Sequence, residues 1–258
     1  MLKKMTKTPL TRLPDAILFD LDNTLYSYDQ AHAEAQNHVK MKIVNTLSIE
    51  PAAFDKAYQE ARQQIKARLD KTASSHSRLL YFQRMLEIMG LGSQVLLALD
   101  FEQTYWRTFL SKATLFDDVK DLLDDIRLLG IPTAIVTDLT TQIQFRKMVY
   151  FELDYYFEYI VTSEEAGFDK PNEVIFNLAL DKIKPKGQSI WMIGDNPVND
   201  ILGSREAINA ITFQKIHDGV KIGIDTCTPD VAFHHFSELR RLLVRLEMKI
   251  DSQIKEPA

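Results

Sequence analysis

Beyond residue 113, the sequence alternates short apolar segments with segments that have helical periodicity. The apolar segments, predicted as strands, are 132–138, 159–163, 189–195 and 211–213, with a further one at 231–236. The helical segments are 117–129, 141–150, 172–183 and 198–207, followed by a charged amphipathic helix over the last twenty residues, with a frayed end. Strands that are apolar throughout and alternate with helices form a parallel sheet whose two faces are both covered. The sequence therefore predicts an α/β fold built on a helix-covered parallel sheet.

One further strand is predicted far upstream, at 15–22, where an apolar run ends in the sequence DLDNT. Between it and the alternating region lies a stretch rich in Ala, Gln, Lys, Arg, Glu and Leu, with helical periodicity broken at Pro51 and at a Gly-Leu-Gly turn. A chain of 258 residues can form one sizeable core and a smaller second domain. We therefore predict a Rossmann-like core at 1–28 and 113–258, and an inserted all-helical cap domain at 29–112.

Composition narrows the classes of function. The net charge of −5 does not favour a nucleic-acid-binding surface, which needs a basic patch. A single cysteine, Cys227, permits no intramolecular disulfide and no cysteine metal cluster, so a reducing cytoplasm is expected. No apolar run approaches the roughly 20 residues that span a bilayer. The basic segment 1–14 lacks the apolar stretch of a signal peptide, and we expect it to be a lead-in without regular structure.

Polar side chains gather where the predicted strands end, which is where open α/β sheets bind their ligands. These residues are Asp20, Asp22 and Thr24 after the first strand, Thr137 and Asp138 after the second, Lys170 beyond the third, and Asp195 and Asp200 after the fourth. Each short motif alone is weakly informative, but all four in this order are specific. Residues two apart on a strand share a face, so the Asp20 and Asp22 carboxylates are expected on the same side.

This set of groups fits the chemistry of phosphoryl transfer. A carboxylate such as Asp20 can attack phosphorus and form an aspartyl-phosphate. Because the carboxylate and the phosphate are both anionic, a divalent cation is needed between them, and Mg²⁺ with Asp20 and Asp195 as side-chain ligands would serve. A protonated Asp22 could protonate the leaving-group oxygen and then take a proton from the hydrolytic water. The side chains of Thr137 and Lys170 would hold the transferring oxygens.

The motifs resemble those of the haloacid-dehalogenase-like (HAD) superfamily of phosphatases, one subfamily of which has a helical cap inserted after the first motif. The matching segments are Asp20-Leu21-Asp22-Asn23-Thr24, Val136-Thr137-Asp138, Lys170-Pro171, and Gly194-Asp195 with Asp200. The resemblance implies that Asp20 is the nucleophile and that Asp22 is the acid/base, with its backbone carbonyl on Mg²⁺. It also implies that Asp195 is a metal ligand. It implies that Asp200 either contacts the metal through water or anchors Lys170; an ordinary helix N-terminal acid is the alternative.

Two positions depart from patterns seen in that superfamily. Asp138 stands where Asn, Ser or Gly is commoner, and because a carboxylate should not face a phosphate, we expect only its backbone N–H to serve. Asp22 stands where true haloacid dehalogenases have Tyr, which favours phosphoryl transfer over dehalogenation. In the predicted cap, His76 and Arg78 are candidate contacts for the leaving group, with plain solvated side chains as the alternative.

The function predicted from the sequence is a Mg²⁺-dependent phosphatase. Its substrate would be a small phosphomonoester metabolite, such as a sugar phosphate or a nucleoside monophosphate, and the protein would be a monomer or homodimer that binds neither nucleic acid nor membrane. The first alternative is a phosphotransferase or phosphomutase, which would pass the phosphoryl group to a sugar hydroxyl. The second alternative is a non-catalytic binding protein on the same fold.

Overall fold

A computed structural model describes residues 2–6, 8 and 10–254 of the chain. Within these residues the strands form one seven-stranded sheet in the order β1-β7-β6-β5-β2-β3-β4. The strands are β1 Lys3–Lys4, β2 Ala16–Phe19, β3 Thr133–Thr137, β4 Tyr159–Thr162, β5 Ile190–Gly194, β6 Ile211–Lys215 and β7 Val231–Phe233. All neighbouring pairs are parallel except β1 and β7. The predicted parallel α/β sheet is confirmed.

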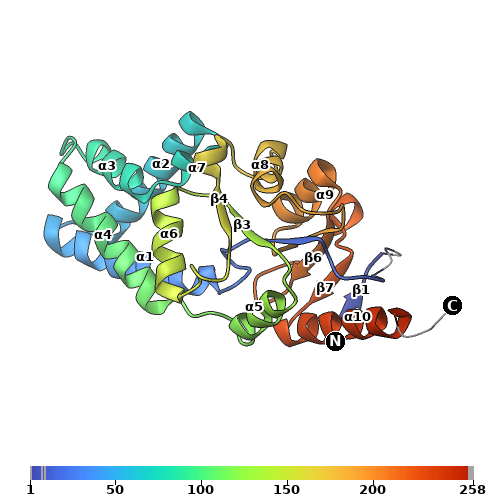
Figure 1. Ribbon diagram of the computed structural model, residues 1–258. Helices are drawn as coiled ribbons and strands as arrows, with labels where there is room; N and C mark the ends of the chain where they lie inside the picture. Colours follow the sequence, from blue (N-terminus) through green and yellow to red (C-terminus); the bar gives the residue numbers. More distant parts are fainter. Residues whose placement is uncertain (1, 7, 9, 255–258) are drawn as a thin grey trace.

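Strand β2 lies at the centre of the sheet, between β5 and β3. Its four residues are fully buried, and alternate side chains enter two different cores. Ile17 and Phe19 pack in the core that contains α5 (Val119–Leu128) and α10 (Phe236–Ile254). Ala16 and Leu18 pack in the core beneath α8 (Glu173–Ile183), and α9 (Gly203–Ile208) lies on the same face (Figure 1). An unbroken apolar sequence is therefore required, because both faces of this strand are covered.

Four helices follow β2 and pack against one another, away from the sheet at the left of Figure 1. They are α1 Tyr28–Leu47, α2 Pro51–Leu69, α3 Arg78–Ile88 and α4 Val95–Lys112, with a short 3₁₀ turn at Ala73–His76. We call residues 28–112 the helical block. Pro51 begins α2, where the missing N–H costs no hydrogen bond. Gly90 and Gly92 both have left-handed φ angles, 77° and 68°, and separate α3 from α4.

The remaining elements connect the sheet. Helix α6 spans Thr141–Phe151, and a one-turn helix α7 spans Ser163–Ala166. A π-helical segment at Pro197–Leu202 runs into α9, where the sequence had predicted one helix over 198–207. The predicted C-terminal helix is α10, Phe236–Ile254, and the last four residues of that prediction, 255–258, lie outside the described residues. No helix among the described residues is long and apolar enough to cross a membrane.

Two sequence-based predictions are wrong in detail. The strand predicted at 15–22 ends at Phe19, because the chain then turns and Leu25 N–H bonds back to the Leu21 carbonyl. Asp20 and Asp22 therefore lie in a loop, and the argument that strand alternation puts them on one side fails. The lead-in at 1–14 is not without regular structure, because Lys3–Lys4 pairs antiparallel with β7 and extends the sheet by one short edge strand.

Candidate active site

The carboxyl ends of the central strands open onto a cavity of about 630 Å³ between the sheet and the helical block. All nine residues singled out in the sequence as catalytic, phosphate-binding, metal-binding or substrate-binding line it. They are Asp20, Asp22, His76, Arg78, Thr137, Asp138, Lys170, Asp195 and Asp200. Because the ends of parallel strands meet at one edge of the sheet, residues more than 170 positions apart in sequence come together here.

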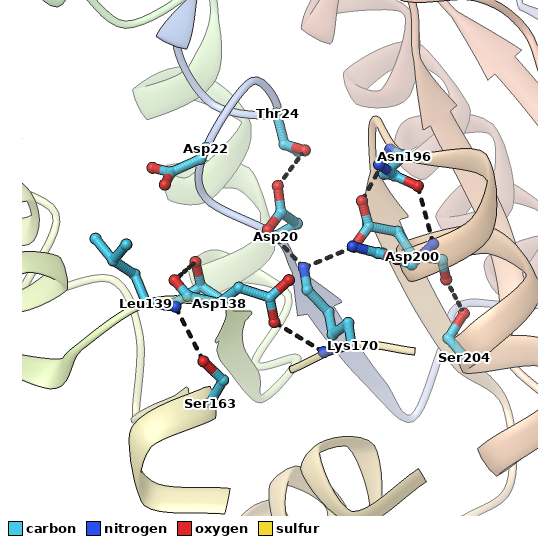
Figure 2. A network of polar contacts seen from close by, with 12 residues as sticks. Asp20, Asp22, Thr24, Asp138, Leu139, Ser163, Lys170, Asn196, Asp200 and Ser204 are labelled. Atoms are coloured by element: carbon cyan, nitrogen blue, oxygen red, sulfur yellow. Dashed lines mark hydrogen bonds and ion pairs between the residues drawn. The ribbon is translucent and has the colours of Figure 1, made fainter. Parts of the chain in front are cut away.

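Lys170 lies between two buried carboxylates (Figure 2). Its Nζ donates to Asp20 Oδ1 and to Asp200 Oδ1, each at 2.6 Å. Thr24 Oγ1 donates to the other oxygen of Asp20 at 2.7 Å. All three charged side chains are at most 7% exposed, so their interaction is only weakly screened by water. The single ammonium leaves this group with one net negative charge when both acids are ionised.

The carboxylate of Asp195 adds to the net negative charge of this group. Asp20, Asp195 and Asp200 each offer one oxygen within 4.8 Å of the others, the one such group of possible ligands found in the described part of the chain. Burial raises the pKa of Asp20 from 3.8 to about 7, although Lys170 opposes it. Burial, followed by the charges of Asp200 and Asp20, raises the pKa of Asp195 to about 9. Hard oxygen donors with unbalanced negative charge suit a hard divalent cation, so the residues present fit Mg²⁺.

Metal binding to this group is expected to depend on pH. Because the pKa values of Asp20 and Asp195 are raised in the folded, metal-free protein, the folded state binds more protons than the unfolded chain between about pH 4 and pH 9. These two groups therefore lower the stability of the metal-free protein as the pH rises through that window. Mg²⁺ must displace those protons, so excess Mg²⁺ should raise Tm more at about pH 8 than at about pH 5.

Differential scanning calorimetry with EDTA or Mg²⁺ measures this difference. Asp195→Asn removes one ligand and should reduce the Mg²⁺-induced rise in Tm at the higher pH. A rise in Tm that is equal at both pH values would contradict the assignment of the ion to these carboxylates.

Asp22 has a different partner. Both of its carboxylate oxygens accept from Lys147 Nζ, at 2.7 and 2.8 Å, and the Tyr26 hydroxyl also donates to it. In Figure 2 the Asp22 side chain points away from Asp20. The Asp22 side chain is 27% exposed, whereas Lys147 is fully buried. Each of the two carboxylates thus has its own lysine, and this arrangement separates them.

Lys147 was not found from the sequence, although a signal was present. Helix α6 buries a continuous stripe of five residues, Ile143, Gln144, Lys147, Met148 and Phe151. Two polar residues on the apolar face of an amphipathic helix are unusual and indicate a specific partner. Gln144 donates to Thr137 Oγ1 and to the Asp138 carbonyl, both at 2.6 Å, and so fixes the end of β3. The Lys147 ammonium lies 5.5–6.0 Å from four aromatic rings, those of Tyr26, Tyr28, Trp106 and Phe109.

Replacing Lys147 tests whether this buried charge stabilises the fold. Lys147→Met keeps the packing among the rings, and Asp22, being partly exposed, can be hydrated instead. We therefore expect the free energy of unfolding, measured by urea denaturation, to stay within about 1 kcal/mol of wild type or to rise. Lys147→Ala also leaves a cavity and should cost about 2 kcal/mol or more. Equal destabilisation by both variants would mean that the ion pair itself holds α6 in place.

The end of β3 presents Thr137 and Asp138. Thr137 is buried, with 1% of its surface exposed, and its hydroxyl accepts from Gln144. The Asp138 carboxylate accepts the backbone N–H of Lys170 at 2.8 Å, and burial raises the pKa of Asp138 to about 6. The Asp138 side chain is therefore already engaged by the backbone of Lys170.

Asp200 is held on both sides. One carboxylate oxygen accepts from Lys170, and the other accepts the Asn196 backbone N–H at 2.9 Å (Figure 2). A Cβ atom at Gly194 would lie 2.4 Å from Asp200 Cβ, so the residue that ends β5 has to be glycine for Asp200 to reach Lys170. Asp200 thus contacts Lys170 directly and also belongs to the acidic group, which combines the two roles considered from the sequence.

His76 and Arg78 come from the helical block. His76 Nε2 lies 2.9 Å from Asp169 Oδ2, on the loop that carries Lys170. The Arg78 guanidinium donates to the His76 carbonyl at 2.7 Å and to the Tyr28 hydroxyl. Neither side chain is merely a solvated surface group, because both line the cavity and contact buried neighbours.

Comparison with known proteins gives the family. A family model for haloacid dehalogenase-like hydrolases matches residues 14–207, about three quarters of the chain. The chain belongs to this hydrolase family, and it is an enzyme.

Curated relatives include a ribulose-1,5-bisphosphate 5-phosphatase from Halopiger xanaduensis. It is 35% identical over 73% of this chain and 80% of its own length. A glyceraldehyde 3-phosphate phosphatase from Methanothermobacter thermautotrophicus is 26% identical over 88% of this chain and 99% of its own length. Among solved structures, a 2-haloacid dehalogenase from Pseudomonas syringae superposes with a TM-score of 0.72 at 20% identity, over 90% of this chain and 99% of that one. The last similarity concerns the fold alone.

Proposed function

We infer that this protein is a phosphatase that hydrolyses a small phosphorylated metabolite. Two curated relatives are phosphatases of sugar phosphates, which supports this class of substrate. The observation that carries the inference is the pair of carboxylates with separate lysines, Asp20 with Lys170 and Asp22 with Lys147. The two acids thus have different environments, which is how a pair of carboxylates divides attack from proton transfer.

In the proposed reaction, a carboxylate oxygen of Asp20 attacks phosphorus, forming an aspartyl-phosphate while the bond from phosphorus to the leaving-group oxygen breaks. Asp22, protonated and turned from Lys147 toward the site, gives its proton to that oxygen. Asp22 then takes a proton from the water that attacks phosphorus, which releases phosphate and restores Asp20. Lys170 and the end of β3, with Thr137 and the Asp138 N–H, hold the phosphoryl oxygens.

The acidic group supports a Mg²⁺ ion in this role. The proposed ligands are Asp20, Asp195 and the backbone carbonyl of Asp22, and the ion would neutralise charge between the nucleophile and the phosphate. Asp200 acts on the reaction by holding Lys170 in place.

We assign residues 29–112 as the cap and residues 1–28 with 113–258 as the catalytic core. The cap contributes His76 and Arg78 to the side of the cavity that receives the leaving group. Closure of the cap over this cavity would exclude bulk water and would strengthen the electrostatic interactions inside it.

Release of inorganic phosphate from a panel of sugar phosphates, with Mg²⁺ or with EDTA, tests this function. Hydrolysis in Mg²⁺ that is lost in EDTA is the expected result. Transfer of the phosphoryl group to an added sugar, without release of inorganic phosphate, would identify a phosphotransferase instead. If no ester is cleaved and EDTA changes neither activity nor Tm, the function is a non-catalytic one.

A further inference from the structure

The wall of the cavity that belongs to the helical block carries three cations. Arg62 and Lys66 project from α2, and Arg78 is the first residue of α3. Two acids of the block also line the cavity, but Asp55 is already paired with Lys40, at 2.6 Å. The block therefore adds positive charge to a cavity whose other wall is acidic.

None of these three cations forms an ion pair with a carboxylate of the described residues. Arg78 donates to the His76 carbonyl and to the Tyr28 hydroxyl, and its Nε is buried without a hydrogen-bond partner. Its guanidinium is packed 5.2–5.8 Å from the rings of Tyr81, Tyr105 and Trp106. A buried, hydrogen-bond-poor guanidinium is costly unless a ligand supplies the missing acceptor.

The spacing of Arg62 and Lys66 on α2 also favours an anion-binding site. Residues 62 and 66 are four apart, so their side chains are neighbours on one face of the helix, and like charges at this spacing destabilise a helix. The pKa of Lys66 is lowered by burial and then by the charges of Arg62 and Arg78, while Asp169 opposes this, so Lys66 lies in the repulsive field of the other two cations. An anion bound among them would relieve this repulsion.

We propose that Arg62, Lys66 and Arg78 bind a second phosphate group of the substrate, so that the enzyme acts on a small bisphosphorylated metabolite. One phosphate would react at Asp20 while the other is held by the helical block. A phosphate dianion balances the charge of three cations better than a singly charged carboxylate would. A guanidinium group can also donate to two phosphate oxygens at once. A cavity of about 630 Å³ is within the usual range for small-molecule sites. This proposal rests on the proposed phosphatase function.

Matched substrates test the proposal by activity. Ribulose 1,5-bisphosphate and ribulose 5-phosphate share a scissile 5-phosphate and differ in the second phosphate. We expect kcat/KM to be at least about ten-fold higher for the bisphosphate, given what one charge-assisted contact contributes. Arg62→Ala and Lys66→Ala should each lower kcat/KM for the bisphosphate about ten-fold, mainly through KM, and leave para-nitrophenyl phosphate within about two-fold.

Arg68→Ala is the matched control, because Arg68 is an exposed cation on α2 that does not line the cavity. It should change none of these constants. Equal kcat/KM for both ribulose phosphates, or equal losses of the Arg62 and Lys66 variants on all three substrates, would overturn the proposal.

A binding experiment separates this proposal from the proposed function. Calorimetric titration of the Asp20→Asn protein with the two ribulose phosphates needs no catalysis. Tighter binding of the bisphosphate that is lost with Arg62→Ala supports the second phosphate site, even if the wild type releases no phosphate and the phosphatase function fails. Equal affinity for both ligands refutes the site, whatever the activity of the wild type.

Discussion

Asp20→Asn is expected to lower kcat for phosphate release by more than about 1,000-fold, because the amide cannot attack phosphorus to form the covalent intermediate. Asp20 lies at the carboxyl end of the central strand, and both of its oxygens are positioned, one by Lys170 and one by Thr24. An asparagine fits the same space. The loss should therefore be in chemistry and not in folding, and a steady-state assay of inorganic phosphate measures it.

The stability of this variant provides the control. Burial and the neighbouring acids raise the pKa of Asp20, so at neutral pH its charge opposes folding of the metal-free protein. Removing that charge should leave Tm in EDTA unchanged or higher, and it should reduce the rise in Tm that Mg²⁺ causes. Asp181→Asn, on the exposed surface of α8, should change neither property. Full turnover by Asp20→Asn would refute its assignment as the nucleophile.

Lys170→Met is expected to affect both stability and turnover. It leaves the Asp20 and Asp200 carboxylates buried without their cation, and removal of one partner from a buried ion pair costs about 3–5 kcal/mol. Turnover should fall by at least about 100-fold, because the phosphoryl oxygens lose their cationic contact. Urea denaturation and phosphate release measure the two effects.

The pH dependence of the loss of stability in Lys170→Met shows whether the unpaired carboxylates cause it. Burial raises the pKa of Asp20, and loss of the Lys170 charge raises it further, so a proton replaces the missing cation as the pH falls and the loss should be smaller at about pH 5 than at about pH 8. Excess Mg²⁺ should restore part of the stability at the higher pH. Lys182→Met, which breaks an exposed pair with Glu165, should cost no more than about 1 kcal/mol. A cost of that small size for Lys170→Met would contradict the ion-pair account.

The parallel sheet and the residues that line the cavity could both be predicted from the apolar strand segments and the residues that follow them. Short apolar runs such as 132–138 and 189–195, which alternate with helical segments, indicate strands buried on two faces, and parallel strands bring their carboxyl ends to one edge. The sequence alone therefore predicts that Asp20, Thr137 and Asp195 lie together. The helices between β2 and β3 also break where the sequence indicated, because α2 begins at Pro51 and α3 ends at Ile88, two residues before Gly90.

The contacts that could not be predicted are those between side chains of different helices, strands and loops. Lys147 reaches Asp22 across 125 positions of sequence, and helical periodicity says only which face of α6 is buried, not what it meets. Arg62 and Lys66 face the cavity because of how the helical block sits over the sheet, which no local pattern encodes. The loop position of Asp22 depended on where β2 ends, and a turn at Leu21–Leu25 decides that.

The insertion of the helical block between β2 and β3 also bears on how such an enzyme can change over time. Because Tyr26 and Leu115 form an antiparallel bridge, the block enters and leaves the core at adjacent points, so a change in its length need not move the strand that carries Asp20. The entropy of closing a loop rises by only about 0.6 kcal/mol for each doubling of its length. An exchange of the whole block could therefore alter the leaving group that is accepted, while the residues that break the phosphoester bond stay where they are.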